Sequence, residues 1–168
     1  MKGYLPDIEI RQNKVEIVEL QGEPDEIAKL KLQFALEKSK GPLLIEDTSL
    51  CFNAFKGLPG PYIKDFLKKL GCDGLVKMVS NQSDKTAYAQ TILGIAKNKK
   101  NVKLFKGITN GEIVAPRGTE NFGWDPIFQV QGMDKTYSEL GPEKNKVSHR
   151  YKAIDEMVKF LKENPDFI

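Results

Sequence analysis

Apolar residues recur with a helical period in two long segments of the chain. The first begins at Pro24, where a proline followed by two acidic residues is typical of a helix start, and it should end before Gly41. The second runs from Val147 to about Asn164. The apolar positions that share one face of these two predicted helices are Ile27, Leu30 and Phe34, and then Val147, Tyr151, Ile154, Met157, Val158 and Leu161.

Between the two helices, alternating or continuous apolar residues predict β-strands. A polar loop at 97–101 should join the two longest strands in a hairpin, and two short helices are expected on either side of Gly71. The predicted strands are 14–19, 43–45, 86–96, 102–109, 111–114 and one that begins at Asp125. Because strands and helices are mixed throughout, the fold class is α/β or α+β.

The composition narrows the class of protein. The 168 residues, of which 40% are hydrophobic, are enough for one domain with a real core, and the net charge of +3 argues against a protein that coats nucleic acid. Cys51 and Cys72 have neither the number nor the spacing of a disulfide scaffold or a metal site, so a reducing compartment fits best. No apolar run approaches the roughly 20 residues of a membrane span and no secretory leader is visible. We therefore expect a cytoplasmic protein without a membrane partner.

Two acidic residues lie where predicted strands end, Glu19 after the first strand and Asp47 after the second. In open α/β sheets, ligands bind outside the carboxyl ends of the strands. Two carboxylates there could hold Mg²⁺, which prefers oxygen ligands and substrate phosphates. Acidic residues also commonly cap strands and begin turns, and on spacing alone that interpretation is favoured.

Two basic residues lie on apolar helix faces. Lys31 falls between Ile27 and Phe34 on the first helix, so it must either extend outward along the surface, the commoner outcome, or face a polar cleft. Arg150 falls on the same side of the last helix as Met157, a position suited to an anion or a nucleobase near a helix start. A salt bridge to a neighbouring acid explains Arg150 equally well.

Aromatic residues flank a glycine in the segment 121–126, which contains the only tryptophan, Trp124. Such a loop can place a ring against a base while Gly123 lets the backbone approach closely, although a structural corner fits the pattern as well. The only histidine, His149, has no serine and aspartate arranged near it as in a catalytic triad. The sequence contains no Gly-x-x-x-x-Gly-Lys-Ser/Thr phosphate loop and no zinc-binding spacing.

Six segments, taken in order, resemble motifs of the inosine triphosphate pyrophosphatase (Ham1-like) family in its eukaryotic form. Their order and spacing are similar to the family over the chain from about Val15 onward. The segments are QGEPDEI (21–27), EDTSLCFNA (46–54), GLPGPYIK (57–64), APRG (115–118), FGWDP (122–126) and EKNKVSHR (143–150).

The resemblance implies a single domain over residues 1–168, with a long mixed central sheet flanked by helices and two lobes around a central cleft. It implies a homodimer with no nucleic-acid partner, and a cofactor that is Mg²⁺ or, as a substitute, Mn²⁺. It also leads us to expect that the chain lacks the strand and the Ser/Thr-Gly-Asn-x-x-Lys loop with which the family begins. That loop would bring backbone amides, an asparagine and a lysine to the phosphates.

Site residues are assigned by the same resemblance. Asp47 and Lys31 would be catalytic; Asp47 would orient or deprotonate the attacking water and, with Glu19, bind the metal. Lys31 and Lys64 would contact the triphosphate, and residues 122–125 would form a wall for the nucleoside. The purine edge would be contacted by Lys144, His149 and Arg150. The full set of implied substrate-binding residues is Lys31, Asp47, Thr48, Lys64, Phe122, Gly123, Trp124, Asp125, Lys144, Ser148, His149 and Arg150.

The implied activity is hydrolysis of non-canonical purine triphosphates (ITP, dITP and XTP) to the monophosphate and pyrophosphate, which cleanses the nucleotide pool. A fixed donor such as Arg150 suits a purine with a carbonyl at position 6 and leaves the 6-amino group of adenine facing another donor. One alternative is a nucleotide-binding or dimerising family member with little turnover, because the phosphate loop is absent. Another is a pyrophosphatase for modified pyrimidine triphosphates, against which Ser148-His149-Arg150 argues.

Overall fold

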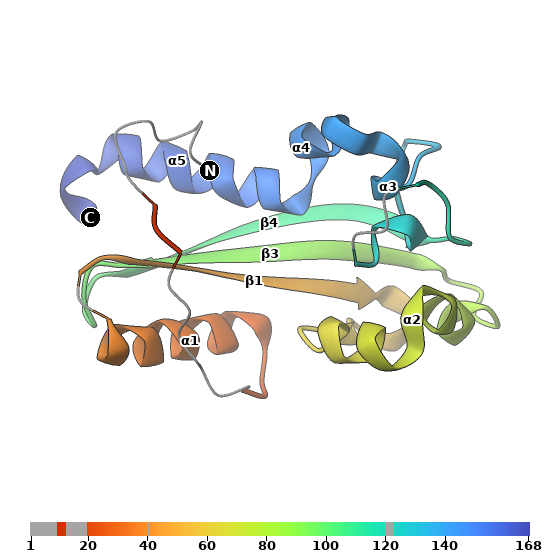
Figure 1. Cartoon of the computed structure of the whole chain (residues 1–168), viewed down its shortest axis with the longest axis horizontal. Helices are drawn as coiled ribbons and strands as arrows, with labels where there is room; N and C mark the ends of the chain where they lie inside the picture. The colour runs from red at the N-terminus through yellow and green to blue at the C-terminus, as the bar shows by residue number, and fades with distance from the viewer. Residues whose placement is uncertain (1–9, 13–19, 40, 120–122) are drawn as a thin grey trace.

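A five-stranded sheet forms the middle layer of the molecule (Figure 1). The computed structural model describes residues 10–12, 20–39, 41–119 and 123–168. Among these residues the strand order is β2-β1-β3-β4-β5, and each pairing is antiparallel. The strands are β1 (Leu43–Phe52), β2 (Pro59–Gly60), β3 (Thr86–Ala96), β4 (Val102–Ile113) and β5 (Phe128–Val130). The predicted α/β fold with a long central sheet flanked by helices is confirmed.

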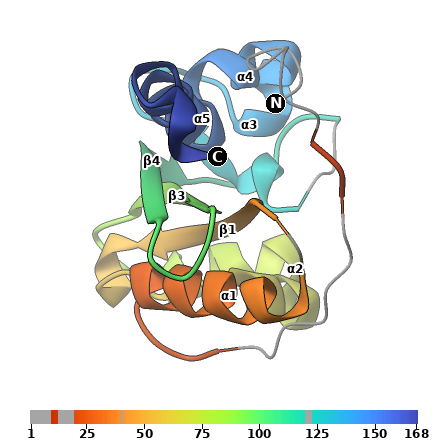
Figure 2. The same cartoon turned by 90° about the vertical axis from the view of Figure 1, so that its left-hand side faces the viewer.

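Helices cover both faces of this sheet (Figure 2). Helix α1 packs on β1 and β3 from one side, and α5 packs on β4 and β3 from the other. Helix α2 lies in the same layer as α1, while α3 and α4 lie in the layer of α5 (Figure 1). The α-helices are α1 (Pro24–Lys38), α2 (Ile63–Val79), α3 (Tyr137–Leu140), α4 (Lys144–Val147) and α5 (His149–Glu163). The 3₁₀ turns are η1 (Asn53–Phe55), η2 (Asp125–Ile127), η3 (Gly141–Glu143) and η4 (Pro165–Phe167).

Burial along the strands follows their place in the sheet. All but two residues of the central strand β3 are buried, because strands pair with it on both sides and helices cover both faces. In β4, by contrast, buried and more exposed positions alternate, as expected when one face of a strand packs on the core. The first six residues of β1 are only half-buried, since β2 pairs with β1 only at Leu50 and Cys51. That stretch of β1 therefore has an open edge within the described part of the sheet.

Several sequence predictions need correction. Strand β1 continues to Phe52, so Asp47 lies in the middle of a strand and not at its end. The short strand predicted at 111–114 largely belongs to β4, since pairing with β3 persists to Glu112. The strand expected to begin at Asp125 starts at Phe128, after the turn η2. The strand predicted at 14–19 lies outside the described residues.

The buried face of α1 also differs from the predicted one. Leu30 and Phe34 are each 38% exposed, and the buried residues are Ile27, Ala28, Leu32 and Ala35. Alanine is small, so Ala28 and Ala35 let the helix approach the sheet closely. The prediction had placed the larger apolar residues on the buried face instead. Helix α2 behaves as predicted, because Gly71 (φ 65°, ψ −178°) breaks it into two parts.

The start of α5 lies directly against the sheet at Gly107. A Cβ atom added there would lie 1.9 Å from the carbonyl oxygen of His149 and 2.5 Å from the backbone nitrogen of Ala153. Both are backbone atoms, so only glycine lets the first turn of α5 come this close to β4. Gly107 thus determines where residues 148–150 lie relative to the sheet.

Candidate active site

A cleft of about 1080 Å³ opens between the two helical layers. Its walls come from α1, β1 and α2 on one side and from the segments around η2, α3, α4 and the start of α5 on the other. The size is that of a typical small-molecule site. The described residues of the predicted site all line it: Lys31, Asp47, Thr48, Lys64, Gly123, Trp124, Asp125, Lys144, Ser148, His149 and Arg150. Glu19 and Phe122 lie outside the described residues.

The edge of β1, which is open in the described part of the sheet, explains how one cleft receives two consecutive acidic residues. Neighbouring side chains of a strand point to opposite faces of the sheet. Asp47 reaches Lys31 of α1 on one face, and Glu46 reaches Arg150 of α5 on the other. A single cleft can contain both contacts only if it extends around the strand edge, which is where β1 is half-buried.

Lys31 and Asp47 form an ion pair on the α1 side of the cleft. The Nζ–Oδ1 distance is 2.6 Å, and the two side chains are 21% and 15% exposed. The second carboxylate oxygen of Asp47, Oδ2, is buried and has no hydrogen-bond partner among the described residues. Of the two predicted outcomes for Lys31, the structure therefore shows the one in which it faces the cleft.

Arg150 and Glu46 form a second ion pair, with Nε 2.6 Å from Oε1. The Arg150 side chain is 54% exposed, so the prediction that it lies on the buried side of its helix is wrong. His149 takes the buried position at the start of α5 instead. The salt-bridge alternative describes the observed geometry, and Arg150 still lines the cleft.

The inner wall of the cleft is aromatic. Trp124 is 8% exposed and lies 5.5 Å from His149 and 6.0 Å from Tyr137, measured between ring centroids. Tyr137 and His149 are stacked, with centroids 5.6 Å apart and planes 25° apart. Lys144 Nζ lies 4.9 Å from the Tyr137 ring centroid and forms an ion pair with Asp125. Tyr137 lies outside the six motifs and is not among the predicted site residues.

Two further residues hold the wall in place. Ser148 caps α5, because its hydroxyl oxygen accepts a hydrogen bond of 3.2 Å from the backbone N–H of Tyr151. Gly123 has φ 59°, a left-handed conformation that favours glycine, and its carbonyl oxygen accepts a weak hydrogen bond from Cys72 Sγ at 3.5 Å. Thr48 of β1, which is not part of this wall, forms a hydrogen bond with Thr91 of β3, with 3.2 Å between the hydroxyl oxygens.

Burial sets the charge of His149. Together with the smaller effects of the nearby cations Lys144, Arg150 and Lys152, it lowers the pKa of the imidazole to about 3. The ring is therefore neutral at physiological pH, and it carries a single N–H proton.

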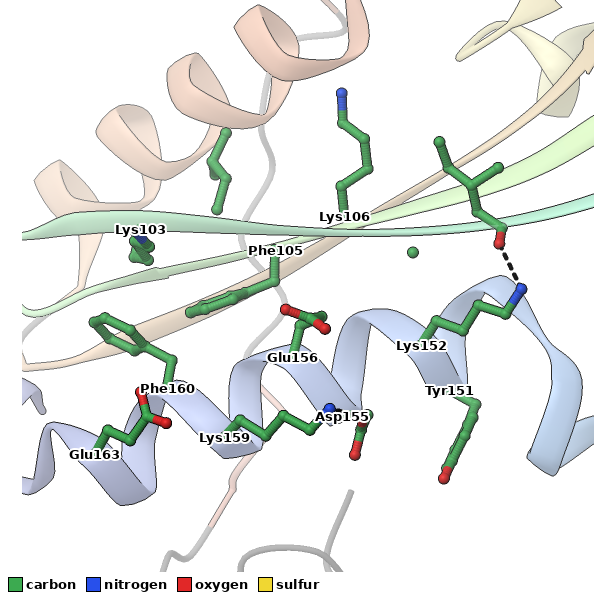
Figure 3. A pocket seen from close by; sticks show the side chains of 13 residues that line it. Lys103, Phe105, Lys106, Tyr151, Lys152, Asp155, Glu156, Lys159, Phe160 and Glu163 are labelled. Atoms are coloured by element: carbon green, nitrogen blue, oxygen red, sulfur yellow. Dashed lines mark hydrogen bonds and ion pairs between the residues drawn. The ribbon is translucent and has the colours of Figure 1, made fainter.

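A second hollow of about 700 Å³ lies between β4 and α5 (Figure 3). Two of its lysines have partners: Lys159 pairs with Asp155 at 2.8 Å, and Lys152 donates a hydrogen bond of 2.8 Å to the backbone carbonyl of Ile108. None of the predicted site residues that the structure describes lines it. The cleft at the β1 edge is therefore the candidate active site.

The described residues contain no group of three or more His, Cys, Asp or Glu side chains that could hold a metal ion. Nor does any helix in the described ranges combine the length and apolar character needed to cross a membrane.

The architecture is that of HAM1 proteins. A HAM1 protein from Coxiella burnetii superposes with a TM-score of 0.85 at 26% identity, over 96% of this chain and 91% of that one. The Ham1 protein of Staphylococcus aureus gives a TM-score of 0.78 at 28% identity, over 96% and 84% of the two chains. A Mycobacterium abscessus protein described as a nucleoside-triphosphatase or dITP/XTP pyrophosphatase shares the fold, with a TM-score of 0.74 at 24% identity over 89% and 81%.

The sequence itself leads to the same group. A family model described as "Ham1 family" matches residues 2–160. This chain belongs to the Ham1 family, and the predicted resemblance is confirmed at that level. The eukaryotic form and the absence of the family's first strand and phosphate loop stay predictions.

Proposed function

We propose that this chain hydrolyses non-canonical purine nucleoside triphosphates, ITP, dITP and XTP among them, to the monophosphate and pyrophosphate. One observation carries the proposal: the Lys31–Asp47 pair and the aromatic wall around Trp124 lie in the same cleft. A nucleoside triphosphate has a dense negative charge at one end and a flat base at the other, and the cleft offers a partner for each. Membership of the Ham1 family supports the same activity.

Cations lie where the phosphates would bind. Lys31 and Lys64 line the cleft from α1 and α2. In the proposed complex they neutralise the phosphate oxygens and stabilise the charge that develops as water attacks the α-phosphorus. Lys31 would exchange part of its contact with Asp47 for a contact with phosphate.

Asp47 fits the role of a magnesium ligand. Its Oδ2 atom is buried and lacks a partner among the described residues, which suits a hard cation that prefers oxygen. Because Mg²⁺ usually binds to one or two carboxylates together with substrate phosphates and water, a larger acidic cluster is not required. Glu19 is our proposed second ligand. When bound, the ion would supply additional positive charge at the phosphates.

The same carboxylate has a second proposed role, in orienting or deprotonating the attacking water. A base must lie within hydrogen-bond reach of the proton that it removes. Lys31 holds Oδ1 at 2.6 Å and so fixes the orientation of the carboxylate. This leaves Oδ2 for the water or the metal.

The other end of the cleft suits a purine with a carbonyl at position 6. Trp124 offers a ring face, and Arg150 and the neutral His149 offer N–H donors. A 6-carbonyl accepts such hydrogen bonds, whereas the 6-amino group of adenine would leave a donor unpaired, which costs about 1–3 kcal/mol. Arg150 would have to leave Glu46 to reach the base, and its half-exposed ion pair is weak enough to allow this.

We also propose that the chain acts as a cytoplasmic homodimer without a nucleic-acid or membrane partner. The nearly balanced charge, with 26 basic and 23 acidic residues, supports the lack of affinity for nucleic acid. Light scattering after size-exclusion chromatography measures the mass in solution and tests the dimer.

Pyrophosphate release from a panel of triphosphates, with Mg²⁺ present, tests the activity. We expect ITP, dITP and XTP to be hydrolysed and ATP to be used at least about 10²-fold less efficiently. Asp47→Asn should lower turnover of ITP by about 10²-fold or more while the melting temperature stays near that of the wild type, because the shape is kept and the carboxylate is lost. Asp155→Asn, which changes an acid of α5 that does not line this cleft, is the matched control.

Two outcomes would contradict the proposal. Equal use of ITP and ATP would refute the specificity, and wild-type turnover by Asp47→Asn would refute both roles of Asp47. Tight binding of ITP without turnover by the wild-type chain would favour the alternative, a nucleotide-binding family member with little catalytic activity.

A further inference from the structure

Thr109 of β4 holds the backbone just before the last residues of the candidate site. It is 3% exposed, and it does not itself line the cleft. Its hydroxyl oxygen lies 2.8 Å from the backbone carbonyl oxygen of Val147. A carbonyl oxygen can only accept a hydrogen bond, so the Thr109 hydroxyl is the donor. A buried side chain outside the cleft thus binds the backbone one residue before Ser148.

This hydrogen bond forms at a helix end, where backbone carbonyls need an outside partner. Helix α4 ends at Val147, and the last carbonyl groups of a helix have no acceptor role within it. The chain then passes through Ser148, which is extended (φ −71°, ψ 154°), and α5 begins at His149. The bond from Thr109 therefore fixes the backbone at the junction of α4 and α5, directly before His149 and Arg150.

Gly107 and Thr109 both contact this junction from one face of β4. Residues two apart in a strand share a face, and both of these are buried. Gly107 lets the carbonyl of His149 come close, but it has no side chain that could hold the segment. The hydroxyl of Thr109 supplies a directional contact instead. Gly107 thus determines how closely the start of α5 approaches the sheet, and Thr109 determines where along the strand it lies.

We infer that Thr109 is a positioning residue: by holding the Val147 carbonyl, it fixes where His149 and Arg150 lie in the cleft and so determines how well the base of the substrate is bound. The inference rests on the proposed function, and it adds a determinant of binding that touches no substrate. The residues proposed to act on the phosphates come from α1, β1 and α2. Loss of the Thr109 hydroxyl should therefore weaken binding of the base and leave the hydrolytic step nearly unchanged.

Thr109→Val removes the donor and keeps the branched shape of the side chain. Valine is favoured in strands, so we expect the variant to fold, and Thr109→Ala removes the same hydroxyl with a different shape. Thr109→Ser keeps the hydroxyl and should behave as the wild type. Thr86→Val is the matched control, because Thr86 belongs to the same sheet and its hydroxyl bonds to Asp84, outside the cleft.

The first measurement is the proton NMR spectrum of the His149 ring in the ligand-free protein. His149 is the only histidine, so its ring signals need no assignment to a residue. Its ring centroid lies 5.5 Å from that of Trp124 and 5.6 Å from that of Tyr137, so a displacement changes the ring-current shifts of its carbon-bound protons. We expect these signals to move in Thr109→Val and Thr109→Ala and to stay in Thr109→Ser and Thr86→Val. Unmoved signals in both variants that lack the hydroxyl would overturn the inference.

The second measurement is the steady-state hydrolysis of ITP. We expect Thr109→Val to raise the KM about tenfold, the effect of one lost hydrogen bond to the base, while kcat stays within about twofold. Thr109→Ser and Thr86→Val should keep the wild-type KM. An unchanged KM in Thr109→Val would overturn the inference even if the melting temperature fell, because Thr109 would then be structural only, and the proposed function would survive. No turnover of ITP by the wild type would overturn the proposed function and this inference together.

Discussion

Substituting Gly107 by alanine should displace the start of α5 and so disrupt the cleft. The added Cβ would lie 1.9 Å from the His149 carbonyl oxygen, and an ordinary contact is about 3.4 Å. Helix α5 must therefore move away from β4 by on the order of 1.5 Å, since both partners are backbone and neither can rotate out of the way.

The expected cost follows from that displacement. Overpacking by one methyl group costs about 1–3 kcal/mol, and the upper end applies when backbone must move. For a domain of this size, about 3 kcal/mol corresponds to a fall in melting temperature of roughly 6–12 °C. Because α5 carries His149 and Arg150 into the cleft, a shift of this size should also lower kcat/KM for ITP by about 10²-fold.

Thermal denaturation and steady-state ITP hydrolysis measure the two effects on one preparation. Gly132→Ala is the control: its added Cβ would meet nothing within 4 Å, so it contributes only the strain of φ +78°, about 1 kcal/mol. We expect that control to keep full activity. If Gly107→Ala melts within about 2 °C of the wild type and retains its activity, the close contact between α5 and β4 does not determine where the site residues lie.

Two further changes test residues of the cleft. Arg150→Ala should raise the KM for ITP by about 10–100-fold, while the free energy of unfolding changes by less than about 1 kcal/mol because the ion pair with Glu46 is half-exposed. The control, Lys159→Ala, removes a similar ion pair of α5 outside the cleft and should change neither the KM nor the stability. A collapse in stability with normal activity in Arg150→Ala would assign Arg150 a structural role. The depressed pKa of His149, about 3 against an ordinary value of 6.5, predicts a contribution to stability that is complete above pH 6.5 and is lost as the pH falls toward 3, because the unfolded chain binds the proton first. Between pH 6.5 and 4.5 this amounts to about 2 kcal/mol, so the free energy of unfolding should fall by that much more in the wild type than in His149→Gln; an imidazole that titrates near pH 6.5 in the folded protein would contradict this.

The fold was predictable wherever the pattern was local. Pro24 and the acids after it mark the start of α1, and the polar residues 97–101 form the hairpin loop. Mistakes arose where tertiary packing overrode the pattern. Leu30 and Phe34 are apolar but partly exposed, while the small Ala28 and Ala35 face the sheet. No single-helix pattern distinguishes these outcomes, because they depend on how closely the helix approaches its neighbours.

The members of the site were more predictable than their contacts. The predicted site residues that the structure describes line one cleft, although they are far apart in the chain. The partners of Lys31 and Arg150 depend on the open edge of β1, which sequence spacing does not indicate. Gly107 did leave a signal, since an isolated glycine in a strand often marks close approach of another backbone. Tyr137 left none, because its role depends on a ring twelve residues away.

The products of ITP turnover test the central claim most directly. In a ³¹P NMR time course with Mg²⁺, we expect the three ITP signals to be replaced by inosine monophosphate and a single pyrophosphate line, because the proposed attack is on the α-phosphorus. The Asp47→Asn variant should leave ITP intact over the same period. Formation of inosine diphosphate with orthophosphate, or no consumption of ITP by the wild-type chain, would contradict the account.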